Sequence, residues 1–126
     1  MKKLTPVLFV EQIEACLDFW VRRLGFTKAV EVPEGDRLGF VILVKDAVEV
    51  MLQSWASVAK DVPALLPESR SSSFLYIEVE NLDEIIAKVE GMEVVIPRRT
   101  TFYGATEIAV RDPGGHVVCF AQMVAQ

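Results

Sequence analysis

The only histidine of the chain and one of its two cysteines lie close together near the C-terminal end, in the segment RDPGGHVVCFAQ, residues 111–122. His116 precedes Cys119 by three residues, and imidazole and thiolate are both good ligands for zinc and related metals. A histidine and a cysteine can also form a nucleophile–base pair. The segment could therefore carry half of a metal site, part of a catalytic device, or only a turn followed by a buried strand.

Local geometry favours the turn and the strand. The letters DPGG, residues 112–115, have the composition of a tight turn, because glycine supplies the positive φ that such turns need. Side chains alternate between the two faces of a strand, so His116 and Cys119 should point in opposite directions. We therefore expect a histidine near the rim of the fold and a packed thiol. A catalytic device that used His116 as its base is not expected.

Composition limits the class of protein. The chain has 126 residues, 52% of them hydrophobic, which suits one compact domain. Its formal net charge of −5 disfavours nucleic acid and anionic membranes and favours a cationic partner. The apolar run near the N-terminus is interrupted by Glu11 and Glu14 before it reaches the length of a signal peptide or a membrane span. We expect a cytoplasmic protein with reduced cysteines.

The sequence contains an internal repeat. TPVLFVEQIEACLDFWVRRLGF (5–26) matches FLYIEVENLDEIIAKVEGMEV (74–94), and FVILVKDAVEVMLQ (40–53) matches TEIAVRDPGGHVVCFAQ (106–122). Each copy reads as strand, helix and further strands, which predicts two βαβββ modules of an α+β fold. The modules should span about 4–54 and 74–126. The connection, 55–73, has no clean period and could hold a short helical turn, so we expect it to be mobile.

Each module has one amphipathic helix. Its apolar residues recur every three or four positions. In the first helix they are Ile13, Cys16, Leu17, Trp20, Val21 and Leu24, and Gly25 is a plausible stop. In the second they are Leu82, Ile85, Ile86 and Val89, with Asn81 and Glu84 placed as a capping box and Gly91 at the end. Trp20 is assigned to the core.

The segments LDFWVRRLGF (17–26) and YGATEIAVRDPGGHVVCFAQ (103–122) make the resemblance specific. The chain resembles the vicinal oxygen chelate superfamily of glyoxalases, bleomycin resistance proteins and dioxygenases, and most of all the resistance proteins. The resemblance implies curved mixed sheets around a cavity, and a homodimer with Phe9 and Met51 near the interface. The fold hosts several kinds of enzyme and also drug-binding proteins, so it leaves the activity open.

In metal-dependent members of the superfamily, the ligands come from the first and last strands of each module. With the closing strands aligned through Gln53 and Gln122, these positions correspond to Thr5, Val50, Phe74 and Cys119. Only Cys119 carries a strong donor, and the nearest spare donors, Glu49 and His116, should point to the opposite faces of their strands. We therefore expect no metal and no cofactor.

Strand alternation also predicts which side chains line the cavity. They are Thr5, Val7, Phe9, Val48, Val50, Leu52, Phe74, Tyr76, Glu78, Val117, Cys119 and Ala121. With the aromatic-Gly segment and a tryptophan at the mouth, the predicted ligand-binding residues are Trp55, Phe74, Tyr76, Glu78, Phe102, Tyr103, Glu107 and Cys119. Glu78 and Glu107 could do acid–base work, or could be solvated carboxylates at the rim.

Two hypotheses about function remain. Aromatic rings with a few carboxylates suit a small planar or cationic molecule, which predicts a metal-free binding protein that sequesters a drug-type ligand and confers antibiotic resistance. The alternative is an enzyme of the superfamily, of the lyase, glyoxalase or dioxygenase type, with an unusual ligand set or a metal-free carboxylate mechanism. No catalytic residue is assigned in either case, and neither nucleic acid nor a membrane is expected as a partner.

Overall fold

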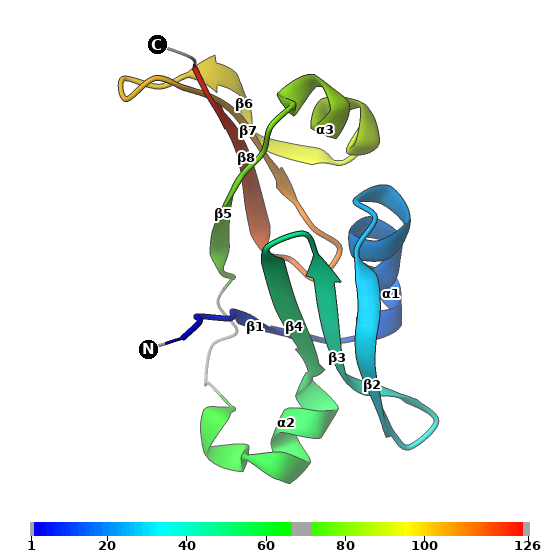
Figure 1. Ribbon diagram of the computed structural model, residues 1–126. Helices are drawn as coiled ribbons and strands as arrows, with labels where there is room; N and C mark the ends of the chain where they lie inside the picture. The colour runs from blue at the N-terminus through cyan, green and yellow to red at the C-terminus, as the bar shows by residue number, and fades with distance from the viewer. Residues whose placement is uncertain (1, 67–71, 125–126) are drawn as a thin grey trace. The chain divides into compact units, whose positions relative to one another are not determined.

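The computed structural model describes residues 2–66 and 72–124. The chain divides into two compact units, Met1–Ser71 and Ser72–Gln126, and each unit contains one four-stranded sheet (Figure 1). The element order in both is strand, helix and three strands. The predicted α+β class and the duplicated βαβββ arrangement are therefore confirmed.

The N-terminal unit has one parallel strand pair in an otherwise antiparallel sheet. Its strands follow the order β1-β4-β3-β2, and β1 runs parallel to β4. The sheet is open at both edges. Its strands are β1 (Val7–Val10), β2 (Thr27–Glu34), β3 (Arg37–Lys45) and β4 (Val48–Ser54).

The helix of this unit changes its pitch. α1 (Ile13–Leu17) continues as a π-helical segment, η1 (Asp18–Arg23), and the wider turn shifts the face that meets the sheet. Phe19 and Trp20 are therefore both fully buried, with ring centroids 5.2 Å apart. Trp20 lies in the core as expected. Sequence periodicity missed Phe19, and the predicted Leu17 and Val21 are only partly buried.

The start of the predicted irregular connection is a helix of the N-terminal unit. α2 (Trp55–Asp61) is capped by the Ser54 hydroxyl, which accepts a hydrogen bond from the Ser57 amide at 3.1 Å, and a short 3-10 turn, η2 (Pro63–Leu65), follows. Gly39 lets this helix approach β3, because a Cβ there would lie 3.3 Å from Cβ of Ser57 in α2. Residues 67–71, where mobility was also predicted, lie outside the described residues.

The C-terminal unit repeats the plan with the strand order β5-β8-β7-β6. α3 (Leu82–Lys88) covers one face of the sheet (Figure 1). Asn81 caps α3 as predicted, accepting from the Glu84 amide at 3.2 Å, and the Gln122 side chain accepts from the Leu82 amide at 2.8 Å. The strands are β5 (Phe74–Glu78), β6 (Glu93–Thr100), β7 (Ala105–Arg111) and β8 (Val117–Met123).

The DPGG turn forms where the sequence predicts it. The Asp112 carboxylate accepts hydrogen bonds from the amides of Gly114 and His116 at 3.0 and 2.8 Å, and Gly115 has φ of 90°. His116 is buried, whereas a position near the rim was predicted. Its Nδ1 accepts a hydrogen bond from the Ser73 amide at 2.9 Å. The histidine therefore ties the start of β5 to β8 and is not presented to a ligand.

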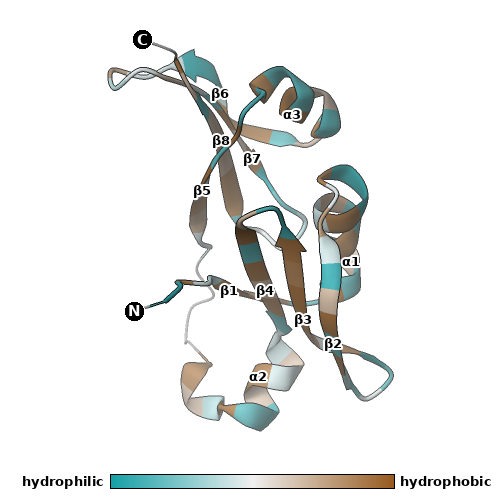
Figure 2. Ribbon diagram, viewed as in Figure 1, coloured by the Kyte–Doolittle hydropathy of each residue, from teal (hydrophilic) through white to brown (hydrophobic). Residues whose placement is uncertain are grey.

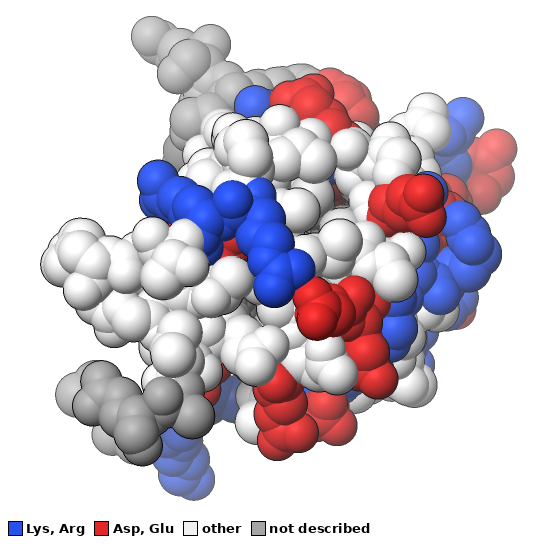
Figure 3. Space-filling view, turned by 90° about the horizontal axis from the view of Figure 1, so that it is seen from above, with Lys and Arg blue, Asp and Glu red and all other residues white. Residues whose placement is uncertain are grey.

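Apolar residues concentrate in the central strands, as Figure 2 shows for β3, β4 and β8. On the face seen in Figure 3, acidic and basic groups lie side by side rather than in a patch of one sign. None of the helices in the described ranges is long and apolar enough to cross a membrane.

Candidate functional site

In the N-terminal unit, the residues on the face of the sheet away from α1 differ from those that were predicted to line the cavity. Phe9 lies opposite Gln53 and Val7 opposite Met51, so Met51 and Gln53 share the face of Val7 and Phe9. The predicted Val48, Val50 and Leu52 lie on the other face, where Val50 and Leu52 are buried in the core. We call the face away from the helix the open face of the N-terminal unit; its residues are Val7, Phe9, Val30, Val32, Phe40, Ile42, Val44, Glu49, Met51 and Gln53.

The alignment of the two repeats through their glutamines is wrong by one residue. Phe9 and Glu78 are equivalent, because each directly precedes the matching valine, Val10 or Val79. Phe9 lies opposite Gln53, but Glu78 lies opposite Ala121 rather than Gln122. Met51, not Val50, therefore holds the register position equivalent to Cys119.

Glu49 is also on the open face, contrary to the prediction. Its carboxylate accepts a hydrogen bond from the Thr5 hydroxyl at 2.9 Å and pairs with Lys3 Nζ at 2.5 Å. The Lys3 ammonium and then the Thr5 hydroxyl hold the pKa of Glu49 below its ordinary value. Thr5 and Glu49 are thus engaged with each other and with a lysine.

The superfamily's metal positions can now be tested against the side chains that occupy them. They are Thr5, Met51, Phe74 and Cys119, which offer an engaged hydroxyl, a thioether, a phenyl ring and a thiol. This set does not fit a divalent metal, which prefers several imidazole, carboxylate or thiolate donors. Among residues 2–66 and 72–124, no three His, Cys, Asp or Glu side chains are grouped to hold a metal ion. Metal independence itself stays a prediction.

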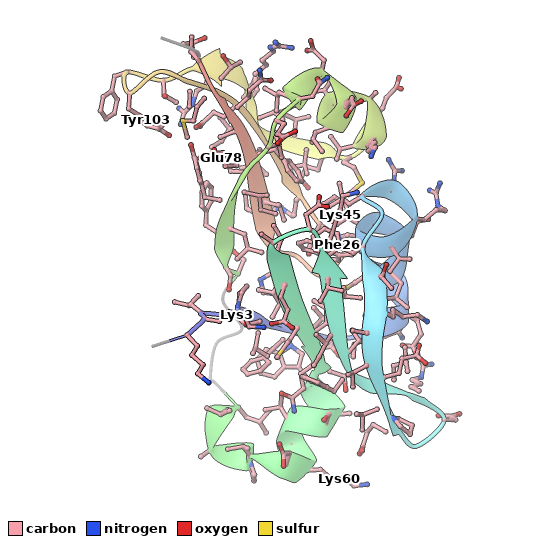
Figure 4. All side chains as sticks on the ribbon, viewed as in Figure 1. Lys3, Phe26, Lys45, Lys60, Glu78 and Tyr103 are labelled. Carbon is pink, nitrogen blue, oxygen red and sulfur yellow. The ribbon has the colours of Figure 1, made fainter. Side chains whose placement is uncertain are left out.

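The N-terminal unit has a hollow of about 640 Å³ beside α2, lined by Val32, Pro33, Glu34, Phe40, Gln53, Ser57, Lys60 and Asp61. Lys60, seen in Figure 4, pairs with Glu34 at its rim at 3.1 Å. None of the predicted ligand-binding residues lines it. Trp55 begins α2 and is buried against Phe9, with ring centroids 5.2 Å apart, so its ring is not exposed at a mouth as predicted.

In the C-terminal unit, most of the predicted residues share the face of the sheet away from α3. We call this the open face of the C-terminal unit. Strand register assigns to it Phe74, Tyr76, Glu78, Glu93, Ile96, Arg99, Glu107, Ala109, Arg111, Val117, Cys119 and Ala121. Its floor is small and apolar, since Ala109, Val117 and Cys119 form a buried cluster against which Ile96 packs.

A buried carboxylate is the centre of this face. Glu107 is 2% exposed, yet both of its oxygens are engaged. Arg99 on β6 donates to Oε2 from Nε at 3.0 Å and from a terminal nitrogen at 2.9 Å. Tyr103, in the turn between β6 and β7, donates its hydroxyl to Oε1 at 3.0 Å. A charged group in such a position needs these partners, because an unpaired buried charge is very costly.

Tyr76 on β5 lies beside this network. The influence of Tyr103 as a hydrogen-bonding neighbour, followed by burial, raises the pKa of the Tyr76 phenol to about 12. The phenol is therefore protonated near neutral pH.

Cys119 lies on the floor opposite Tyr76. Burial, and then the nearby Glu107 charge, raise the pKa of the Cys119 thiol to about 11. The thiol is therefore protonated near neutral pH. A protonated thiol is neither a good nucleophile nor a good metal ligand.

The rest of the predicted site surrounds this network. Phe74 and Glu78 flank Tyr76 on β5 and are exposed, and Figure 4 shows Glu78 on β5 and Tyr103 near the tip of the β6–β7 hairpin. Phe102 extends into solvent, with its ring edge-on to Tyr103 at 5.1 Å. The structure thus brings together six of the predicted residues, namely Phe74, Tyr76, Glu78, Tyr103, Glu107 and Cys119.

Sequence reasoning missed Arg99, which neutralises Glu107. The signal was available in the hairpin. The glycine that closes its turn, Gly104, has φ of 86°, and the two strands pair symmetrically about this turn, with Arg99 opposite Glu107. Counting equal steps back and forward from the turn would have placed the arginine and the glutamate side by side.

Comparison with known proteins agrees with this architecture. Residues 4–120 match the family model described as the Glyoxalase/Bleomycin resistance protein/Dioxygenase superfamily. The chain therefore belongs to this superfamily. None of the curated proteins with which the chain was compared matches it.

Solved structures share the fold at low sequence identity. TioX from Micromonospora sp. ML1 is 18% identical with a TM-score of 0.81, and the match covers 98% of this chain and 100% of TioX. A lactoylglutathione lyase from Agrobacterium tumefaciens is 14% identical with a TM-score of 0.76, over 97% and 94% of the two chains. A glyoxalase/bleomycin resistance protein/dioxygenase from Nocardioides is 20% identical with a TM-score of 0.73, over 98% and 85%. At these identities the likeness shows the fold and not the activity.

Proposed function

We propose that this chain is a non-catalytic member of the superfamily that binds a flat, cationic or hydrogen-bonding organic molecule on the open face of its C-terminal unit. The observation that carries the proposal is the state of Glu107. The carboxylate is buried, and Arg99 and Tyr103 engage both of its oxygens. A general base needs a lone pair within reach of the substrate proton, whereas Glu107 is buried and three of its roughly four lone-pair sites are taken by Arg99 and Tyr103.

The other reactive groups of this network support binding over catalysis. A thiol with a pKa of about 11 and a phenol with a pKa of about 12 both keep their protons at neutral pH. General acid–base catalysis works best with groups that titrate near the operating pH. Cys119 and Tyr76 are therefore poor candidates for proton transfer or nucleophilic attack.

The same face offers a surface suited to an aromatic ligand. Phe74, Tyr76 and Tyr103 are 57%, 45% and 50% exposed, and Tyr103 is bonded to the buried carboxylate of Glu107. Flat rings stack on aromatic side chains, and cations are attracted to the ring faces and to the carboxylate of Glu78. Such a surface fits sequestration of a drug-type molecule, with antibiotic resistance as the biological outcome.

Two further features belong to the proposal. We place the protein in the cytoplasm, where its two unbridged cysteines, Cys16 and Cys119, would stay reduced. We also propose a homodimer, because the open faces expose Val7, Val30, Val32 and Phe74, and exposed apolar surface of this kind is commonly covered by a second subunit.

Acridine orange, a flat fluorescent cation, tests the binding site. We expect saturable binding by fluorescence anisotropy, and we expect Phe74→Ala to weaken it by roughly 1–3 kcal/mol, the usual size of a lost stacking contact. Phe40→Ala is the matched control, because it removes a ring from the hollow of the N-terminal unit. A loss of affinity with Phe40→Ala alone would place the ligand in that hollow and contradict the proposal.

A further inference from the structure

The guanidinium of Arg99 meets Glu107 with one edge only. Its Nε and Nη2 atoms, which share an edge of the planar group, both point at Oε2 of Glu107, at 3.0 and 2.9 Å. Within residues 2–66 and 72–124, Arg99 has no other hydrogen-bond or ion-pair partner. The end of the group, formed by Nη1 and the outer side of Nη2, therefore keeps N–H donors that are directed away from the carboxylate.

These donors are held in place and reach solvent. Two charge-assisted bonds to one oxygen fix the plane of the guanidinium, and Glu107 is itself buried and bonded to Tyr103 at 3.0 Å. The Arg99 side chain is nevertheless more than half exposed. A ligand that binds an arginine normally has to order it, and here the bonds to Glu107 have already removed much of that freedom.

The other two arginines of the β6–β7 hairpin are engaged differently. Arg98 donates to a carboxylate of α3 at 2.7 Å, so it belongs to the face that the helix covers. Arg111 is on the open face, but its Nε donates to Glu93 at 2.9 Å and its Nη1 to the Gly115 carbonyl at 3.2 Å. Both ends of the Arg111 guanidinium are thus in use, whereas one end of Arg99 is available on the open face.

Charge decides which acceptor suits these donors. Glu107 already balances the positive charge of Arg99, at 2.9 Å. A ligand carboxylate would place a second negative charge on the same guanidinium, close to a buried anion, and like charges at that distance repel. A neutral carbonyl oxygen accepts the same N–H groups without this repulsion. The free end of Arg99 therefore favours a neutral acceptor.

An aromatic surface adjoins the donors. Tyr103 and Arg99 bond to the two oxygens of one carboxylate, so the phenol and the guanidinium are neighbours. The Tyr103 ring is half exposed, and a flat ring stacked on it brings its edge to the guanidinium. Glu78, which is exposed, ends the same register row through Ala121, three strand spacings or about 14 Å from Arg99.

From this arrangement we infer that Arg99 is a specificity-determining residue, which selects flat aromatic ligands that carry a neutral carbonyl oxygen at their edge. Glu107 is a positioning residue, because it holds the plane of the guanidinium and balances its charge. The inference rests on the proposed function, and it adds the chemical class of the ligand and the residue that recognises it.

Two cations that differ by one carbonyl test the inference. The trimethylammonium derivatives of fluorenone and fluorene, substituted at the same ring carbon, share a flat ring system and a charge, but only the first has a carbonyl oxygen. By isothermal titration calorimetry, we expect the wild-type protein to prefer the fluorenone cation by roughly three- to tenfold, the value of one net hydrogen bond. Arg99→Lys keeps a positive charge beside Glu107 but removes the planar group, so it should bring the ratio of the two affinities close to one.

The matched control is the neighbouring residue on β6. Arg98→Lys makes the same substitution on the side of the strand that faces α3, and it should leave the ratio unchanged. An equal loss of both cations in Arg99→Lys would mean that Arg99 only maintains the surface, and this would overturn the inference.

The role of Glu107 is tested by charge. Glu107→Gln leaves the Arg99 charge unbalanced, so the carboxylate of fluorenone should gain affinity relative to the fluorenone cation, by roughly three- to tenfold. Asp36→Asn makes the same change of charge in the β2–β3 turn of the other unit and should not produce this gain. An equal gain in both variants would mean that only the net charge of the protein matters, and this would overturn the role of Glu107.

The outcomes separate the two proposals. If both cations bind and Phe74→Ala weakens them, but the wild-type protein does not prefer the carbonyl or Arg99→Lys leaves the ratio unchanged, the inference is wrong and the proposed function stands. If neither these cations nor acridine orange bind, the proposed function fails and the inference fails with it. Circular dichroism and thermal unfolding of each variant establish that a loss of binding is not a loss of fold, and the wild-type ratio tests the inference without any variant.

Discussion

The ion pair between Arg99 and Glu107 can be tested by its effect on stability. Replacing Arg99 with glutamine leaves a 2% exposed carboxylate with only the Tyr103 hydroxyl as a described partner. Breaking a fully buried pair costs about 3–5 kcal/mol, whereas an exposed pair contributes about 0–1 kcal/mol. The Arg99 side chain is 57% exposed, so the expected loss lies between these limits, at about 2 kcal/mol in the free energy of unfolding.

Urea denaturation measures this loss, and the neighbouring residue supplies the control. Arg98 pairs with Asp83 at 2.7 Å, but both side chains are largely exposed, so Arg98→Gln should cost less than about 1 kcal/mol. The double variant Arg99→Gln/Glu107→Gln should lose about 1–2 kcal/mol less than the sum of the single variants, because the two residues interact directly. Equal losses for Arg98→Gln and Arg99→Gln, or additive single variants, would refute this reasoning.

Three further expectations concern the thiol, metals and assembly. In a Cys16→Ala background, alkylation of Cys119 should accelerate about tenfold per pH unit up to about pH 10, since only the thiolate reacts and its pKa is about 11; a plateau near the ordinary value of 9.0 would contradict this. The melting temperature should not respond to Zn²⁺, Ni²⁺, Mn²⁺ or EDTA, and stoichiometric metal that is lost with Cys119→Ala would exclude a metal-free site. Light scattering at micromolar concentration should give the mass of a dimer, and a monomeric mass would rule out the proposed assembly.

Much of the fold could be predicted because its signals are local. The repeat fixed the element order, Asn81 and Glu84 marked the start of α3, and the DPGG segment marked a turn. The first helix was only partly predicted, because the π-helical segment shifts the buried face by a residue, a change that an α-helical period does not contain. Phe19 was missed for this reason.

The faces of the strands near the closing hairpins were less predictable, since they depend on turn length. Asp46 and Ala47 alone connect β3 to β4, whereas residues 112–116 connect β7 to β8. Residues that match in sequence between the two repeats therefore lie on opposite faces of their sheets, because a shift of one residue exchanges the two faces of a strand. The predictions for Val50 and Glu49 failed for this reason. The candidate site was better predicted in the C-terminal unit, where only Arg99 was missed.

The bonds among Tyr103, Glu107 and Arg99 have a consequence for the entropy of binding. They connect β6 and the tip of the β6–β7 hairpin to the buried carboxylate on β7, so they hold this part of the surface in place before any ligand arrives. Side chains that are already ordered lose little further freedom on binding, and each rotamer-rich side chain immobilised by a ligand would otherwise cost about 0.5–1.5 kcal/mol. The hairpin tip with Tyr103 is thereby kept in place by the bond from its hydroxyl to Glu107, and a rigid ligand meets a surface that is preorganised for it.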